Sequence, residues 1–141
     1  MKKPVIILDD GATDVGLAEM LYHLLRQNLK QNPKKVSSFE VLNSNVVIVA
    51  RDIDITVTLA FRGGELTIYN GIVGKADLKI IADHDAILAL SLINIFIGLP
   101  NYLDKNGRDI LKRFFHGNIK IKGLLRHPLQ LTLLTKIFSV N

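Results

Sequence analysis

The stretch FFHGNIKIKGLLRHPLQLTLLTKIF, residues 114–138, decides the fold. Between Gly117 and Gly123 it alternates isoleucine with lysine, which predicts a short strand with its apolar side chains inward and its lysines in water. After Gly123 the stretch is rich in leucine at three- and four-residue spacing, which predicts a helix. Pro128 suits the first turn of that helix because its missing N–H is not needed there. The stretch therefore predicts a strand that turns sharply into a helix.

This predicted helix carries two neighbouring apolar stripes. The residues of the two stripes are, in order, Leu129, Leu133 and Ile137, and then Leu131, Leu134 and Phe138. We expect one stripe to seal on the core and the other to contact a ligand or to insert shallowly into a membrane.

Upstream, residues 12–32 repeat apolar side chains at helical spacing and end at Asn32–Pro33, which predicts an amphipathic helix. The segment PKKVSS after it is interpreted as a polar connector. Residues 45–82 hold three or four strand patterns with short loops, which predict a largely antiparallel meander. The clearest is DITVTLAF, residues 54–61, whose strict alternation predicts a sheet with one face on the core.

The tract AILALSLINIFIGL, residues 86–99, is apolar almost all round. It is shorter than the roughly 20 residues that a membrane span needs, so we interpret it as a buried helix with Asp83 as its N-cap. Residues 108–116 predict a further helix. Helices this apolar over a sheet supply more nonpolar surface than packing requires, so the surplus can line a cavity; a solid core is the alternative.

Composition fits one globular domain of 141 residues, because 48% of the residues are hydrophobic and 22% are charged. The chain has no cysteine, which excludes disulfides, thiolate catalysis and cysteine-based zinc sites. This composition fits a reducing compartment, and we expect a cytoplasmic protein. The opening MKKPVIILDDGAT is not expected to be a signal peptide, because Asp9 and Asp10 interrupt its apolar run too early.

Charge is divided unevenly along the chain. Residues 1–104 carry 10 basic and 12 acidic side chains, whereas residues 105–141 carry 8 basic side chains and one acidic side chain. Such asymmetry favours a polyanionic partner, either a nucleic acid or an anionic lipid surface; a merely solvated basic face is the alternative. Nucleic acid is disfavoured because isoleucines, rather than stacking aromatic rings, interleave the lysines. We expect contact with an anionic membrane through the basic residues Lys112, Arg113, Lys120 and Lys122.

No arrangement of residues predicts catalysis. The DHD triplet at residues 83–85 begins a helix, so its side chains diverge and cannot all reach one metal ion. His23, His116 and His127 lie on three different predicted elements and have no carboxylate partner in the sequence. We therefore expect no catalytic residue, no metal and no cofactor.

Three segments, in order, resemble the sterol-carrier-protein type 2 (SCP-2-like) lipid-transfer family. They are the hairpin TVTLAFRGGELTIYNG, the strand and acidic helix start KADLKIIADHDAILAL, and residues 114–138, the most specific of the three. The resemblance covers about residues 36–140. It implies an α/β fold with a five-stranded, mostly antiparallel sheet covered on one face by helices. The expected single domain comprises an N-terminal helix region, 1–35, and the sheet with its C-terminal helices, 36–141.

The resemblance also implies function. It implies a hydrophobic cavity between sheet and helices, and a carrier of fatty acyl chains, sterols or other lipids rather than an enzyme. The apolar pattern predicts that the cavity is lined by Leu88, Leu92, Phe96, Phe115, Leu131, Leu134 and Phe138. A longer insert, residues 91–113, either extends or plugs the cavity. The alternatives are an interaction module with a filled cavity and, less favoured, a basic nucleic-acid-binding module.

Overall fold

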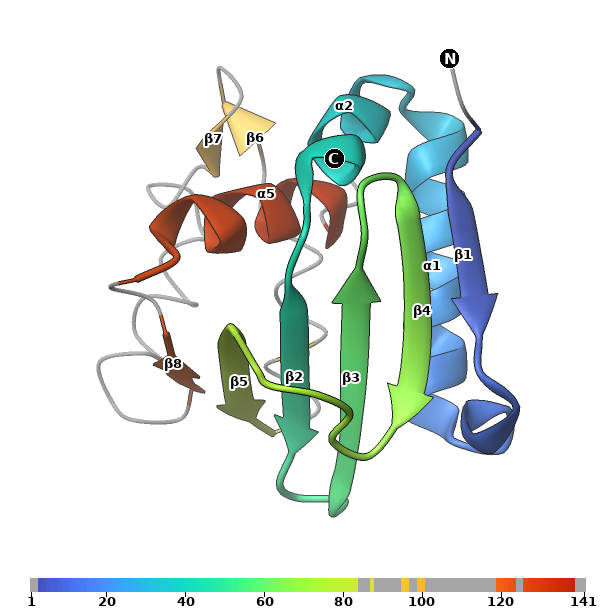
Figure 1. Cartoon of the computed structure of the whole chain (residues 1–141), viewed down its shortest axis with the longest axis vertical. Helices are drawn as coiled ribbons and strands as arrows, with labels where there is room; N and C mark the ends of the chain where they lie inside the picture. The colour runs from blue at the N-terminus through green and yellow to red at the C-terminus, as the bar shows by residue number, and fades with distance from the viewer. Residues whose placement is uncertain are drawn as a thin grey trace.

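A computed structural model describes residues 3–83, 87, 95–96, 99–100, 119–123 and 126–138, with only the backbone described at 95–96 and 99–100. It is a mixed α+β structure in which helices pack on one face of a sheet (Figure 1). The described elements are β1 (Val5–Leu8), the 3-10 turn η1 (Asp10–Ala12), α1 (Gly16–Gln31), α2 (Lys34–Val41), β2 (Asn45–Ala50), β3 (Ile55–Phe61), β4 (Glu65–Asn70), β5 (Leu78–Ala82), β6 (Ile95–Phe96), β7 (Leu99–Pro100), β8 (Ile119–Lys122) and α5 (Pro128–Phe138).

The main sheet has the strand order β1-β4-β3-β2-β5-β8. Three of its strand pairs are antiparallel, and the pairs β1·β4 and β2·β5 are parallel. The expected mostly antiparallel sheet is confirmed, with six strands instead of five. The additional strand, β1, was not predicted because its four residues, VIIL, form an unbroken apolar run without alternation.

The predicted meander is wrong at β5, which lies parallel beside β2 rather than antiparallel beside β4. The connecting segment, residues 71–77, therefore crosses the face of the sheet opposite the helices (Figure 1). Thr58, on the face of β3 that points away from the helices, is buried under this segment. Its hydroxyl donates to the carbonyl oxygen of Gly71 at 2.6 Å and accepts from the amide of Val73 at 3.1 Å.

The polar connector predicted after α1 is instead the helix α2. Pro33 has helical backbone angles at its N-cap, so the proline that ends α1 also begins the next helix. Phe39 of α2 is fully buried and meets Phe61 of β3 edge to face, with ring centroids 6.1 Å apart. The polar segment PKKVSS contains no aromatic residue, and the buried Phe39 follows directly after it.

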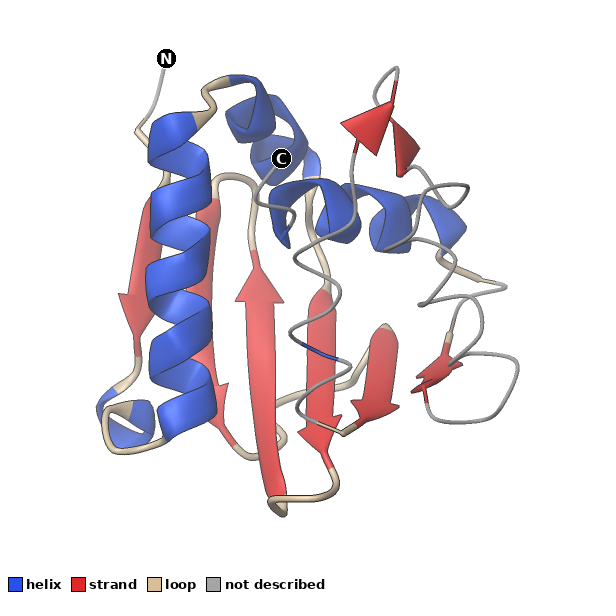
Figure 2. Ribbon diagram, turned by 180° about the vertical axis from the view of Figure 1, so that it is seen from behind, coloured by secondary structure: helices blue, strands red, loops and turns tan. Residues whose placement is uncertain are grey.

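Helix α1 lies along β1 and β4, whereas α5 runs across the strands (Figure 2). Asn28 of α1 joins the two helices. Its side chain is buried, and its amide nitrogen donates to the carbonyl oxygens of Ile137 at 3.0 Å and Phe138 at 2.9 Å. The last carbonyls of a helix lack intrahelical partners, so Asn28 satisfies the end of α5 from 109 residues away.

The predicted strand and helix of residues 119–138 are confirmed, with Pro128 as the first residue of α5. Gly123 links them with a φ of +90°. A Cβ atom at this position would collide with the carbonyl oxygen of Asp77, so the turn requires glycine for both its backbone angle and its space.

We expect Asn28→Ala to lower the free energy of unfolding by about 2–3 kcal/mol, because two buried carbonyls lose their partner. Urea unfolding followed by circular dichroism measures the change. Gln27→Ala, at the neighbouring exposed position on the same helix, is the control and should cost less than about 0.5 kcal/mol. Equal losses in the two variants would contradict the role of Asn28.

Gly123→Ala should destabilise the fold by at least about 2 kcal/mol, since the methyl group meets backbone and the positive φ disfavours alanine. Gly16→Ala is the matched control, because a Cβ there has open space and alanine favours a helix. Thermal unfolding of both variants tests this. A Gly123→Ala protein with an unchanged Tm would show that the turn adapts.

Candidate functional site

The sheet presents a continuous apolar wall toward the helices. Register places Val57 on one side of Ile48 and Ile80 on the other, and Ile121 beyond Ile80. On β2, β3, β5 and β8 the buried residues of this wall are Val46, Ile48, Ala50, Val57, Leu59, Phe61, Leu78, Ile80, Ala82 and Ile119. Four residues of α5 belong to the same cluster: Leu133, Leu134, Ile137 and Phe138. A wall of this kind can hold a nonpolar molecule but offers it no charge.

Among the buried residues that the structure describes, Lys35 is the one ionisable side chain. Desolvation by burial lowers the pKa of Lys35 below its ordinary value. It lies on α2 and not on the sheet wall. The described wall therefore contains no acid–base pair of the kind that catalysis requires.

The predicted cavity residues are only partly covered by the structure. Leu134 and Phe138 are buried and Leu131 is half-buried, all on α5 and all packed with the core cluster. Phe96 lies in β6, where the backbone alone is described. The remaining three, Leu88, Leu92 and Phe115, lie outside the described residues. The cavity itself stays a prediction.

The two stripes of α5 are both largely buried, so exposure does not distinguish a core-facing stripe from a membrane-facing one, and contact of either stripe with a ligand stays a prediction. Of the first stripe only Leu129 is exposed, at 62%, while Leu133 and Ile137 are buried. The second stripe is buried at Leu134 and Phe138. Helix α5 packs against both α1 and α2, and these contacts cover most of both stripes. Shallow membrane insertion through an exposed leucine stripe therefore finds no support.

Two of the predicted membrane residues, Lys120 and Lys122, are exposed on β8 while Ile119 is buried, as the alternation predicted. Lys112 and Arg113 lie outside the described residues. Of the helices within the described ranges, none is both long and apolar enough to cross a bilayer.

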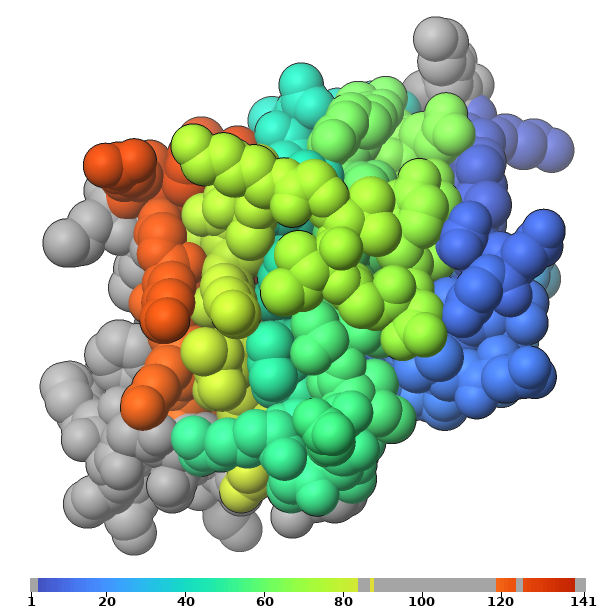
Figure 3. Space-filling model, turned by 60° about the horizontal axis from the view of Figure 1, so that its bottom comes forward, coloured from blue at the N-terminus to red at the C-terminus, as the bar shows by residue number. Residues whose placement is uncertain are grey.

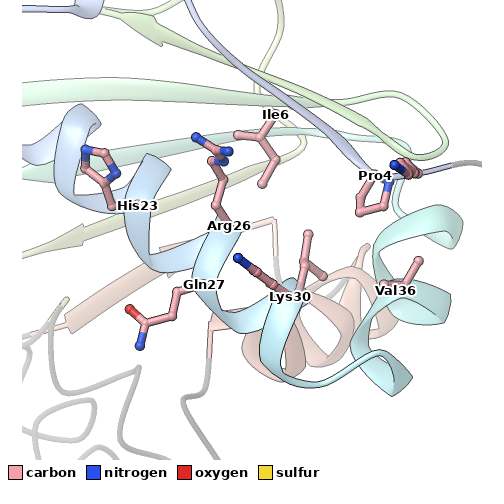
Figure 4. Close-up of a pocket in the computed structure, with 9 residues that line it drawn as sticks. Pro4, Ile6, His23, Arg26, Gln27, Lys30 and Val36 are labelled. Carbon is pink, nitrogen blue, oxygen red and sulfur yellow. The ribbon is translucent and has the colours of Figure 1, made fainter.

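A pocket of about 630 Å³ lies between α1, α2 and the start of β1 (Figure 4). We call it the α1–β1 pocket. Its apolar residues are Pro4, Ile6, Leu29 and Val36, and its polar residues are Lys3, His23, Arg26, Gln27 and Lys30. The guanidinium of Arg26 lies 5.2 Å from the ring centre of Tyr22 and donates to its hydroxyl at 3.0 Å. No carboxylate is among the lining residues.

A second pocket, of about 450 Å³, lies on the outer side of the sheet edge formed by β5 and β8. We call it the β5–β8 pocket. It is lined by Lys75, Ala76, Asp77, Lys79, Lys122, Gly123, Arg126 and His127. Figure 3 shows the two contributing segments, near residues 80 and 120, side by side. The Nε2 atom of His127 is 4.0 Å from Oδ1 of Asp77.

Sequence reasoning found part of one basic feature, the β5–β8 pocket. It predicted a basic surface at Lys122 but missed Lys75 and Lys79, because both come from the part of the chain with net negative charge and join β8 only through the β5·β8 register. The α1–β1 pocket was missed entirely. Its trace in the sequence is the polar stripe of α1 at His23, Gln27 and Lys30. Within the described ranges, no group of three or more His, Asp or Glu side chains is placed to hold a metal ion.

No family model matches the chain, and no curated protein matches it in sequence. Solved structures do share its fold. A chain described as "UbiJ-SCP2 Ubiquinone synthesis protein" matches with a TM-score of 0.62 and 14% identity over 87% of this chain and 96% of that one. A crystal structure of sterol carrier protein 2 matches with a TM-score of 0.52 and 12% identity over 84% and 90%.

A third match is a stereoselective inverting sec-alkylsulfatase from Pseudomonas sp., with a TM-score of 0.53 and 17% identity. It covers 90% of this chain but only 16% of the sulfatase. At these identities the comparisons establish the fold, which is SCP-2-like, as the resemblance implied.

Proposed function

We propose that this chain is a non-enzymatic binding or transfer protein for a hydrophobic ligand, held in an apolar cavity between the sheet and its helices. The observation that carries the proposal is the uncharged wall of β2, β3, β5 and β8 faced by buried side chains of α5. A fatty acyl chain, a sterol-like molecule or another lipid gains free energy by leaving water for such a wall, at about 25 cal/mol per Å².

The comparisons support this class of ligand. Sterol carrier protein 2 is named for a sterol, and the other full-length match is named for ubiquinone synthesis. Both names concern molecules that are mostly hydrocarbon. The candidate ligands are therefore acyl chains, sterol-like molecules and other lipids.

A second candidate is an accessory or interaction module whose cavity is filled by its own side chains. The match to one sixth of an alkylsulfatase favours it, because there the same fold is one part of a much larger enzyme. The two candidates differ in one measurable property, which is space for a ligand.

The ligand proposal is tested by native mass spectrometry of the purified chain, followed by organic extraction. We expect adducts that disappear on extraction and a lipid in the organic phase. A chain that carries no adduct and does not take up a fluorescent fatty acid would favour the filled module instead.

A pair of α5 variants locates the binding site. Leu131→Arg places a charge at a half-buried position predicted to line the cavity, and we expect fatty-acid affinity to fall by about tenfold or more. Leu129→Arg makes the same change at an exposed position two residues away and should alter affinity by less than about twofold. Similar losses in both variants, with unchanged circular dichroism, would place the ligand elsewhere.

We also propose that the carrier meets an anionic membrane through Lys112, Arg113, Lys120 and Lys122. Exposure of Lys120 and Lys122 supports the contact, since each basic side chain near such a surface contributes about 1 kcal/mol. Electrostatic attraction is then the main term, because Leu133 and Leu134 of α5 are buried and Leu131 is half-buried, which leaves Leu129 as the one exposed leucine of this helix.

Lys120→Gln with Lys122→Gln should weaken binding to anionic vesicles by about thirtyfold, and added salt should also weaken wild-type binding. Lys30→Gln with Lys34→Gln removes the same charge from exposed positions on α1 and α2 and is the control. Co-sedimentation measures both. If the two double variants lose equal binding, net charge alone accounts for the attraction.

A further inference from the structure

Two lysines face each other directly on the outer side of the sheet. In the antiparallel β5·β8 ladder, Lys79 is the register partner of Lys122. Like charges at directly opposed positions destabilise a sheet. A neutral side chain at either position would avoid this repulsion. An anion that lies between the two ammonium groups would also relieve it, because the anion attracts both.

The β5–β8 pocket concentrates further positive charge around this pair. Lys75 and Arg126 also line it, so four basic side chains share about 450 Å³ with one carboxylate, that of Asp77. In the part of the chain that the structure describes, no carboxylate lies within 4.0 Å of these four cationic groups. Oδ2 of Asp77 accepts the backbone amide of Asn45 at 2.8 Å, so this acid is already engaged.

Hydrogen bonds from Asn45 fix the walls of the pocket. The side-chain amide of Asn45 donates to the carbonyl oxygen of Lys75 at 3.1 Å, and its backbone carbonyl accepts the amide of Asp77 at 2.9 Å. On the other side, the amides of Arg126 and His127 both donate to the carbonyl oxygen of Gly123, at 3.2 and 2.9 Å. Because the backbone is held in this way, the ordering cost at binding is confined to the side chains that contact the ligand.

We infer that the β5–β8 pocket binds a phosphate group that carries two or more negative charges, as in a phosphomonoester or a diphosphate. The charge of the pocket determines the class of ligand. Four basic side chains and one carboxylate, which is already hydrogen-bonded, leave more positive charge than a single negative charge would balance. Arginine and lysine both bind phosphate oxygens with charge-assisted hydrogen bonds. The phosphate belongs either to a free metabolite or to a lipid headgroup. The site goes beyond the proposed apolar cavity and does not require it, because it lies on the opposite face of the sheet.

The inference is tested with sodium pyrophosphate titrated into the ¹⁵N-labelled chain and followed by NMR and by calorimetry. We expect saturable binding with one ion per chain and chemical-shift changes at residues 75–79 and 122–127. Lys79→Gln with Lys122→Gln should weaken the affinity by about tenfold or more. Lys30→Gln with Lys34→Gln has the same net charge and should weaken it by less than about twofold.

Stability gives an independent readout. In phosphate-free buffer, Lys79→Gln should raise the midpoint of urea unfolding, because it removes the opposed charge, and pyrophosphate should then stabilise the wild type more than the variant. Equal weakening in the two double variants, or a Lys79→Gln variant that is less stable without the ion and equally stabilised by it, would overturn the site.

Two further arms identify the source of the phosphate. Binding of pyrophosphate and of vesicles that contain phosphatidic acid, with weaker binding to phosphatidylglycerol vesicles of equal charge, assigns a headgroup; binding of pyrophosphate with no preference between vesicles assigns a free metabolite. Tighter binding of a single-stranded oligonucleotide that depends on the same lysines would overturn the inference in favour of nucleic acid. Fatty-acid uptake by the Lys79/Lys122 variant reports on the cavity separately, and its retention would show that the two sites are independent.

Discussion

One buried amide holds the helical layer together. Asn28 of α1 reaches the last carbonyls of α5, and a wrong residue there would leave two buried acceptors without a donor. The other end of α5 is set by the Gly123 turn against Asp77. Fixed at both ends, α5 runs across the strands and buries Leu133 and Leu134 in the core cluster. The apolar wall, and with it the proposed ligand site, depends on that position.

The two faces of the sheet have different chemistry. The face toward α1 and α5 is apolar and lacks charge in its described part, which suits a hydrocarbon ligand. The opposite face is crossed by residues 71–77 and carries the β5–β8 pocket at its edge. One strand, β8, serves both faces through alternation, with Ile119 inward and Lys122 outward. A ligand with a nonpolar body and an anionic ligand would thus meet opposite sides of the same strand.

Periodicity in the sequence was sufficient for α1, the β3–β4 hairpin, β8 and α5, because each has an alternating or helical pattern that packing preserves. It was insufficient for β1 and α2. The VIIL run of β1 does not alternate, and the start of α2 is too polar to show a helical pattern before Phe39. Parallel pairing of β5 with β2 depends on a long-range crossing that no local pattern encodes. Asn28 and the β5–β8 pocket could not be predicted for the same reason, because each exists only where distant segments meet.

The edges of the sheet have a consequence for solubility. Among the described strands, β8 and β1 end the sheet, and each leaves a row of backbone groups without a neighbouring strand. Lysines on β8 repel a second copy of that edge, which is how many proteins prevent strand-to-strand aggregation. On β1, Val5 and Ile7 are 46% and 41% exposed, so its protection is its length of four residues. Neutralising the β8 lysines, by mutation or by a bound anion, removes this charge repulsion from one edge of the sheet. Two copies of the chain can then pair at that edge, so binding measurements on the neutralised protein should depend on chain concentration.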